Sequence, residues 1–168
     1  GPCVIENLPD ISDVSTILRT KQSLGAQIRM INKSTVEIDP RHVNSFVVSK
    51  KMAEGMRASS YFLGALLGRM LRARVAPPGG CDFGVRPIDQ HIKGFEALGA
   101  KMTIENGMVD AKAMSLTGCL IYLDVVSVGA TINIMLAAAK ADGLTIIENA
   151  AREPHIVDLA NFLNSMGA

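Results

Sequence analysis

Val4-Ile5-Glu6-Asn7 recurs near the end of the chain as Ile146-Ile147-Glu148-Asn149, and each copy is followed by a polar turn and a helical run. Those two runs end in Leu24-Gly25-Ala26 and Met166-Gly167-Ala168, and a third ending of this kind, Leu98-Gly99-Ala100, lies between them. A glycine in this place is typical of the left-handed residue that terminates a helix. The copies are spaced by about seventy residues, which indicates an internally repeated architecture.

The segment after each of the first two helix ends predicts a β-hairpin. Residues Ile28–Asp39 and Lys101–Ala111 alternate apolar and polar side chains. The first segment turns at Asn32-Lys33 and the second at Asn106-Gly107, and Asn-Gly is the stronger hairpin signal. A short run rich in β-forming residues follows each hairpin, and we expect these runs to be strands: Ser45-Phe46-Val47-Val48 and Leu120-Ile121-Tyr122-Leu123.

A second helix closes each unit. Residues Ala58–Leu71 and Ala130–Ala141 carry apolar side chains at helical spacing. The unit is therefore strand, helix, hairpin, strand and helix, and it occurs twice. The third unit stops at Ala168, directly after its first helix, so we expect the rest of it downstream in a longer protein. The apolar residues expected to face the core are Leu63, Leu66, Leu67 and Met70 in the first helix, and Ile132, Ile134, Met135 and Leu136 in the second.

The composition limits the possible functions. The chain has 168 residues, enough for one domain with a sizeable core, and its net charge of +1 argues against nucleic acid or an anionic membrane as the main partner. Three widely spaced cysteines without a C-x-x-C motif suggest neither a disulfide framework nor a zinc site, and they favour a reduced, cytosolic setting. No apolar run is long enough to span a bilayer, because Asp124 interrupts the longest one. The sequence has no G-x-G-x-x-G, P-loop, H-E-x-x-H or G-x-S-x-G motif, so common nucleotide-fold and hydrolase signatures are absent. We expect no cofactor and no metal.

The stretch from Pro77 to Gln90 holds the strongest candidate for chemistry. It contains three glycines and three prolines, so it forms a loop, and Pro87 leads into the run that ends at Leu98. Cys81, Arg86 and a helix start therefore fall within a few residues, a setting suited to an anion beside a nucleophile or an acid. The alternative is a glycine-rich surface turn with a half-buried cysteine.

Three helix starts occupy comparable places in the repeat: Gly55–Ser59, Arg86–Asp89 and Val126–Thr131. Each offers free backbone N–H groups and the positive end of a helix dipole, and two of them add an arginine. If the three starts converge, they form a site for an anionic, phosphorylated ligand.

Each helix start also has a simpler interpretation. Ser59 or Ser127 can cap a helix, Arg57 can pair with Glu54 at the surface, and Asp89 can favour a first helical turn through the dipole alone. His91, close to Asp89, can contact a ligand or can be an exposed helical histidine. The case for a site rests on the recurrence of these features in the repeat.

The motifs resemble those of a known enzyme family. Pro78-Gly79-Gly80-Cys81 with Gly84-Val85-Arg86-Pro87-Ile88-Asp89 resembles the active-site loop of the UDP-N-acetylglucosamine 1-carboxyvinyltransferases. The likeness covers essentially the whole chain and extends to three further motifs: Gly55–Ser59, Val126–Thr131 and Ile147-Glu148-Asn149-Ala150-Ala151-Arg152-Glu153-Pro154.

The resemblance implies an α+β (α/β) fold, an inside-out α/β barrel or prism of repeated βαβαββ units with helices inside and sheets outside. Residues 1–168 would be most of one domain, and the second domain would be absent. The implied reaction transfers the enolpyruvyl group of phosphoenolpyruvate to the 3′-hydroxyl of UDP-N-acetylglucosamine and releases phosphate. It is the first committed step of bacterial peptidoglycan synthesis, in the cytoplasm.

The resemblance also implies roles for individual residues. Cys81 would be the catalytic cysteine, which protonates or covalently captures phosphoenolpyruvate and is the target of fosfomycin. Arg57 and Arg86 would hold anionic groups of the substrates. Some family members carry lysine where this chain has Val125. The valine has no charge, so the resemblance does not imply a charged side-chain contact with the substrate at this position. The residues implied to line the nucleotide-sugar site are Arg86, Pro87, Ile88, Asp89 and Gln90, with Val125, Val126, Ser127 and Val128 at the diphosphate and uridine.

Two parts of the family's site are missing from the sequence. The Lys-Asn motif that helps to bind phosphoenolpyruvate would lie before Gly1, and the second domain would supply a catalytic aspartate and another arginine. We therefore expect the isolated chain to be inactive or nearly so. Two alternatives remain: a relative of the shikimate-3-phosphate enolpyruvyl transferase, and a non-catalytic nucleotide-sugar-binding module in which Cys81 is idle.

Overall fold

A computed structural model describes residues 1–53, 56–77 and 88–168, with Arg57 described by its backbone alone. In chain order the elements are β1 (Cys3–Ile5), α1 (Ser12–Ser23), β2 (Gln27–Asn32), β3 (Thr35–Asp39), β4 (Val47–Val48), α2 (Lys50–Ala53), the 3-10 helix η1 (Arg57–Ser60), α3 (Tyr61–Met70), β5 (Arg72–Val75), α4 (Asp89–Ala97), β6 (Lys101–Glu105), β7 (Met108–Lys112), β8 (Leu120–Tyr122), α5 (Val128–Ala138), β9 (Ile146–Glu148) and α6 (Pro154–Ser165).

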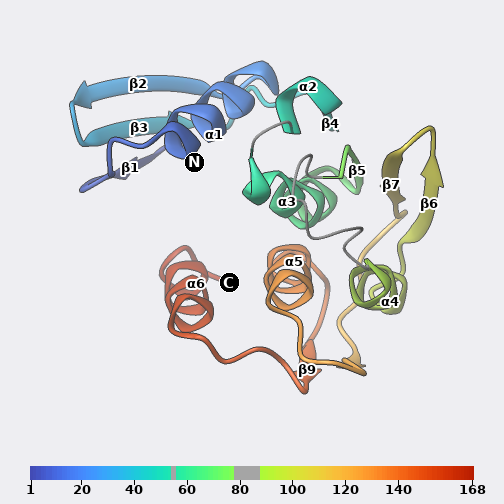
Figure 1. Cartoon of the computed structure of the whole chain (residues 1–168). Coiled ribbons are helices and arrows are strands. Elements are labelled where there is room, and N and C mark those ends of the chain that lie inside the picture. The colour runs from blue at the N-terminus through green and yellow to red at the C-terminus, as the bar shows by residue number, and fades with distance from the viewer. Residues whose placement is uncertain (54–55, 78–87) are drawn as a thin grey trace.

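The sheets lie on the outside and the helices inside, as the resemblance implied (Figure 1). In the described part of the chain there are three separate sheets, with the strand orders β1-β3-β2, β4-β5-β7-β6 and β8-β9. They flank the helices on three sides, with α3, α4 and α5 between them and α6 beside α5 (Figure 1). Within the described residues these sheets do not join into a closed barrel.

Sheet topology confirms the repeat. The β2–β3 and β6–β7 pairs are the two predicted antiparallel hairpins. β4 pairs in parallel with β5, and β8 pairs in parallel with β9 in the same way. The second hairpin turns at Asn106 and Gly107, both with positive φ, which is the geometry that an Asn-Gly turn prefers.

The predicted helix ends are also confirmed. Gly25, Gly99 and Gly167 have φ values of 104°, 99° and 92° and follow the C-terminal caps of α1, α4 and α6. A side chain at such a φ is strained, which explains why the three copies share glycine at this place. The repeated Asn7 and Asn149 also have positive φ, 59° and 54°.

The core forms where α3 packs against α5. Leu63, Leu66 and Leu67 of α3 are buried together with Ile134 of α5, as the helical spacing predicted. The helices come so close at Gly64 that an added Cβ would overlap the carbonyl oxygen of Asn133. The interior of the molecule therefore depends on an intimate helix–helix contact.

Two elements are not predicted from the sequence. β5 lies at the centre of its sheet between β4 and β7, but its four residues, Arg72–Val75, alternate charged and apolar side chains too briefly to stand out. The short helix α2 was missed as well, and the strand predicted over Ser45–Val48 is restricted to Val47–Val48.

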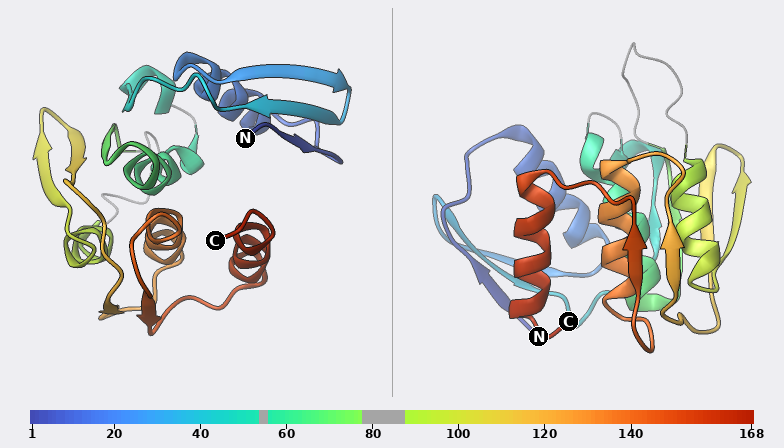
Figure 2. Two further views of the ribbon diagram at one scale, coloured as in Figure 1. Left: turned by 180° about the vertical axis from the view of Figure 1, so that it is seen from behind. Right: turned by 90° about the horizontal axis from the view of Figure 1, so that it is seen from below.

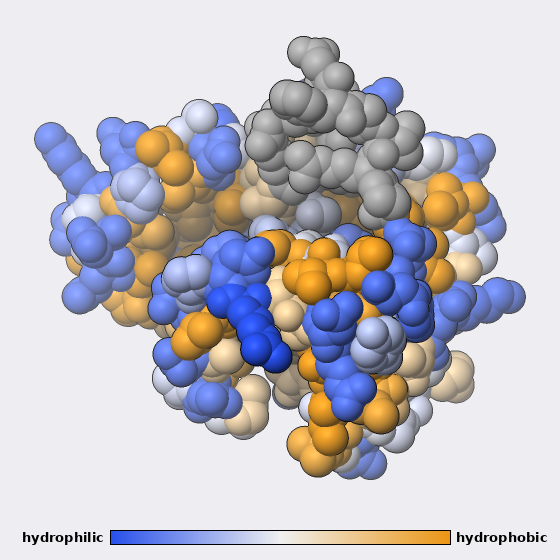
Figure 3. Space-filling model, turned by 60° about the horizontal axis from the view of Figure 1, so that its bottom comes forward, coloured by the Kyte–Doolittle hydropathy of each residue, from blue (hydrophilic) through white to orange (hydrophobic). Residues whose placement is uncertain are grey.

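Among the described residues no helix is long and apolar enough to cross a membrane, and no three histidine, cysteine or acidic side chains gather as a metal-ion site. The surface carries separate apolar patches among charged residues, as the space-filling view shows (Figure 3). Exposed apolar side chains include Leu120, Tyr122 and Ile146 on the β8–β9 sheet.

Candidate functional site

The helices of the core begin at one end of the molecule. Gly64 and Gly68 of α3 lie against Asn133 and Ala137 of α5, so these two helices run parallel. His91 and Gly94 of α4 lie against Gly129 and Ile134 of α5, so α4 runs parallel to α5 as well. In the right-hand view of Figure 2 the helices stand side by side. The convergence of helix starts that the repeat suggested is therefore present for α3, α4 and α5.

The side chain of Asn133 joins α3 to α5 through hydrogen bonds near the starts of both helices. Its fully buried side chain accepts a hydrogen bond from the backbone N–H of Gly64 at 2.9 Å and donates one to the carbonyl oxygen of Gly129 at 3.0 Å. A buried carboxamide with both ends paired favours a single arrangement of the two helices.

Thr131 ties the start of α5 to the segment before α6. Its buried hydroxyl donates to the carbonyl oxygen of Ser127 at 2.8 Å and accepts from the backbone N–H of Ala151 at 3.1 Å. Asn133 was not predicted from the sequence, and Thr131 was included only as the last residue of the Val126–Thr131 helix start. The available signal was a pair of polar residues inside the otherwise apolar run of α5.

Ser127 is the N-cap of α5, as one of the simpler interpretations proposed. Its Oγ accepts a hydrogen bond from the backbone N–H of Ala130 at 3.3 Å. Val125 and Val126 precede it, each 59% exposed, and Val128 is the first residue of the helix. An exposed segment thus leads into a capped helix start, where unpaired N–H groups and the dipole favour an anion.

The start of α4 lies beside this segment. Ile88 precedes the helix and packs against the core, and Asp89 is its first residue. The Gln90 side chain donates from Nε2 to Asp89 Oδ2 at 2.9 Å, and this bond is the main reason that the pKa of Asp89 lies below its usual value. The Oε1 atom of Gln90 also accepts a hydrogen bond from the backbone N–H of Asp124 at 2.9 Å.

His91 fills the space between α4 and α5. An added Cβ on Gly129 would lie 3.2 Å from its Nε2, so the imidazole packs directly on the first turn of α5. Its Nδ1 is buried and has no hydrogen-bond partner among the described residues. Burial lowers the pKa of His91, and Asp89 opposes that effect. The histidine is half-buried, so the exposed-histidine interpretation is wrong.

Several predicted site residues lie outside the part of the chain that the structure describes. Cys81, Arg86 and Pro87 fall within residues 78–87, and Arg57 is described only as the first residue of η1. The predicted pair of Arg57 with Glu54 is outside the described residues as well. Ser59 is fully buried, and its Oγ has no partner among the described residues, so it is not a helix cap there.

Sequence comparison places the whole chain in a family. The EPSP synthase family (3-phosphoshikimate 1-carboxyvinyltransferase) matches residues 1–168. UDP-N-acetylglucosamine 1-carboxyvinyltransferase 3 of Caldanaerobacter subterraneus subsp. tengcongensis is 58% identical over 168 residues, which are 100% of this chain and 40% of that protein. The enzyme numbered 2 of Bacillus subtilis is 53% identical over 164 residues, 98% of this chain and 38% of that protein. The chain therefore spans about 40% of the length of the first of these relatives.

Solved structures agree on the fold. The enolpyruvyl transferase NikO from Streptomyces tendae matches all of this chain and 40% of its own, with a TM-score of 0.84 and 24% sequence identity. An EPSP synthase from Acinetobacter baumannii matches 94% of this chain and 37% of its own, with a TM-score of 0.67 and 18% identity. At these identities the likeness shows a shared fold.

Proposed function

Because the chain belongs to the EPSP synthase family of carboxyvinyltransferases, we propose that it is the sugar-nucleotide-binding part of a UDP-N-acetylglucosamine 1-carboxyvinyltransferase. The enzyme would transfer the enolpyruvyl group of phosphoenolpyruvate to the 3′-hydroxyl of UDP-N-acetylglucosamine and release phosphate. This reaction would serve peptidoglycan synthesis in the bacterial cytoplasm. The observation that carries the proposal is the side-by-side placement of Ile88–Gln90 and Val125–Val128 at two parallel helix starts.

These helix starts suit an anionic ligand. The N–H groups in the first turn of a helix have no acceptor within the helix, and the dipole adds positive potential. The diphosphate of the sugar nucleotide would lie near Val125, Val126, Ser127 and Val128, while Arg57 and Arg86 would neutralise its charge and that of phosphoenolpyruvate. The exposed valines offer apolar surface to a nucleoside.

The catalytic step is proposed for Cys81. A thiol at this position would protonate the methylene carbon of phosphoenolpyruvate, or would add its sulfur to the neighbouring carbon while the methylene carbon takes the proton. Fosfomycin would alkylate the same sulfur. No metal or cofactor is needed for this chemistry. A second domain of the same protein would complete the site, since the chain covers about 40% of its relatives. The isolated chain would then bind the sugar nucleotide without turnover.

Calorimetric titration tests which ligand the chain binds. The chain should bind UDP-N-acetylglucosamine and should not bind shikimate 3-phosphate. The opposite preference would favour the shikimate-pathway reaction that the family description names. Phosphate release at the rate of a full-length enzyme would contradict the expectation that the isolated chain lacks turnover.

Mass spectrometry tests the cysteine. After incubation with UDP-N-acetylglucosamine and fosfomycin, one adduct should appear on the peptide that contains Cys81. Cys3 and Cys119 of the same chain are internal controls, and the Cys81→Ser variant should stay unlabelled. A chain that binds the sugar nucleotide but takes no adduct at Cys81 would be a binding module with an idle cysteine.

A further inference from the structure

Gln90 has one of the most constrained polar side chains of the candidate site. Only 6% of the residue is exposed, although it lies in the first turn of α4 at the surface end of the helix. Its Oε1 accepts the backbone N–H of Asp124 at 2.9 Å. Its Nε2 donates to Asp89 Oδ2 at 2.9 Å and to Asp124 Oδ2 at 3.3 Å.

The partners fix the orientation of the Gln90 amide. Exchanging its oxygen and nitrogen would point Nε2 at a backbone N–H and would point Oε1 at two carboxylates. Both Nε2 hydrogens have acceptors, and burial keeps the group from water. Both N–H groups of the side-chain amide therefore donate to protein acceptors, and neither is left to donate to a ligand.

The contacts of Gln90 join two segments of the proposed binding site. Asp89 belongs to the start of α4, and Asp124, 34 residues after Gln90, directly precedes the exposed Val125 and Val126. Lys93 of α4 adds an ion pair to Asp124, with 2.6 Å between Nζ and Oδ1. Both side chains of that pair are substantially exposed, so the buried amide is the stronger constraint.

On this basis we propose that Gln90 is a positioning residue, whose side-chain amide holds the Asp124–Ser127 backbone against the start of α4 and so sets the spacing of the sugar-nucleotide site. This inference rests on the proposed function. It gives Gln90 a role different from the substrate contact that the family resemblance implied.

The isosteric variant Gln90→Glu tests the proposal. It keeps an acceptor for the Asp124 N–H but replaces both donors with a carboxylate beside two others. Losing both donated hydrogen bonds and crowding three carboxylates should make the Asp124 backbone separate from α4 more often. We therefore expect amide hydrogen exchange at Asp124 to rise about tenfold and the affinity for UDP-N-acetylglucosamine to fall about tenfold. Gln22→Glu, an exposed position on α1, introduces the same charge and should change neither quantity.

The double variant Gln90→Glu/Asp124→Asn supplies a rescue. It exchanges amide and carboxylate between the two positions, so the new amide at position 124 can donate to the new carboxylate at position 90, which still accepts the backbone N–H of residue 124. We expect both exchange protection and affinity to recover toward the values of the original chain. If the single variant is unfolded, the double variant is measured alone: recovered exchange protection and affinity support the pairing, and loss of either contradicts it.

The outcomes separate the alternatives. An affinity loss without a change in exchange would make Gln90 a direct ligand contact, and faster exchange with unchanged affinity would make it purely structural; both overturn the proposal. Unchanged affinity and exchange would do so too. If the original chain does not bind UDP-N-acetylglucosamine at all, the proposed function fails and the positioning role falls with it. The exchange rates would still report whether the Gln90–Asp124 bond exists.

Discussion

The carboxamide of Asn133 accepts the backbone N–H of Gly64 at 2.9 Å, and this single buried hydrogen bond joins two residues 69 positions apart in sequence. The two residues lie in equivalent helices of the two repeat units. The bond sits close to the end of the core where α3, α4 and α5 begin. It connects the stability of the fold to the geometry of the proposed site.

Asn133→Ala should destabilise the chain by about 2 kcal/mol, because it leaves the buried Gly64 N–H and Gly129 carbonyl without their side-chain partner. Urea unfolding should show a lower midpoint with an unchanged slope. Asn161→Ala removes the same group from an exposed position on α6 and is the matched control. A midpoint for Asn133→Ala equal to that of the control would contradict the prediction.

Gly64→Ala should destabilise the chain by about 1–3 kcal/mol, although helix propensity alone would make alanine more stable by about 1 kcal/mol. The reason is the Asn133 carbonyl, which an added methyl group would overlap and which is backbone that cannot rotate away. Thermal unfolding measures the sign. Ala65→Ser, on the exposed side of the same helix, should stay within about 0.5 kcal/mol of the original chain.

His91 should make the chain less stable in mild acid. Because burial lowers its folded pKa below the usual 6.5, protonation favours the unfolded state, so stability is lost as the pH falls from about 7 through the folded pKa. His91→Phe should reduce this loss, which unfolding midpoints at pH 7 and pH 5 will measure. A nuclear magnetic resonance titration giving His91 a pKa above 6.5 would refute the assignment.

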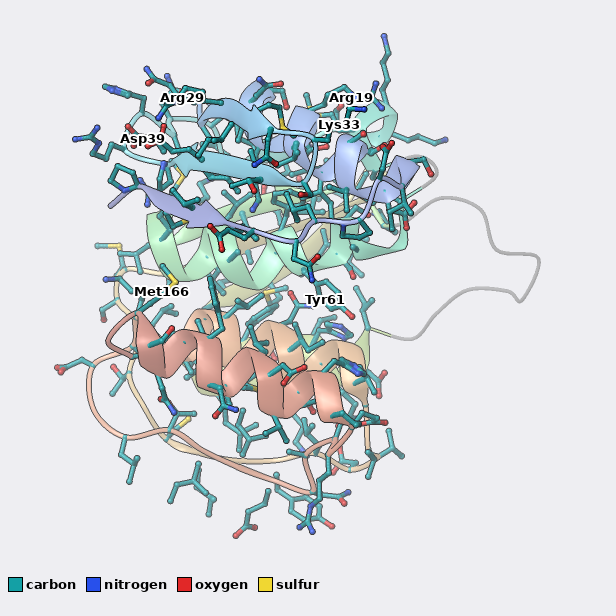
Figure 4. All side chains as sticks on the ribbon, turned by 90° about the vertical axis from the view of Figure 1, so that its left-hand side faces the viewer. Arg19, Arg29, Lys33, Asp39, Tyr61 and Met166 are labelled. Carbon is teal, nitrogen blue, oxygen red and sulfur yellow. The ribbon has the colours of Figure 1, made fainter. Side chains whose placement is uncertain are left out.

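Asp39 should contribute to stability above about pH 4 and lose that contribution in acid. Arg41 donates to its carboxylate from the guanidinium and from the backbone N–H, and these bonds lower the pKa of Asp39 from 3.8 to about 2. Asp39 lies on the same hairpin as Arg29 (Figure 4). Because the folded pKa is depressed, the stabilisation fades as the pH falls from about 5 toward 2.

The Asp39→Asn and Arg41→Gln variants should each flatten this part of the pH profile. Combining them should flatten it no further, since they remove the same interaction. Thermal unfolding between about pH 5 and pH 2 gives the profile. Additive effects of the two substitutions would show that the two residues act through different partners.

Local sequence was sufficient to predict the turns and helix ends of this protein. Gly25, Gly99 and Gly167 terminate helices, and Asn106-Gly107 turns a hairpin, because these conformations depend on the residue at the position and its immediate neighbours. The recurrence of these signals predicted two copies of one unit. The motif around Cys81 and its relatives elsewhere in the chain indicated the family before any helix was placed.

How the site is held together depends on tertiary packing. Nothing local shows that Gln90 reaches Asp124, that Asn133 reaches Gly64, or that His91 is half-buried against Gly129. Each contact joins residues from different elements. The distance between the two residues depends on how closely the helices approach each other, or on how closely a helix approaches the end of a strand. The spacing of apolar residues in the sequence assigns a residue to one face of a helix or strand. Which polar group it contacts there depends on how the backbones of neighbouring elements pack.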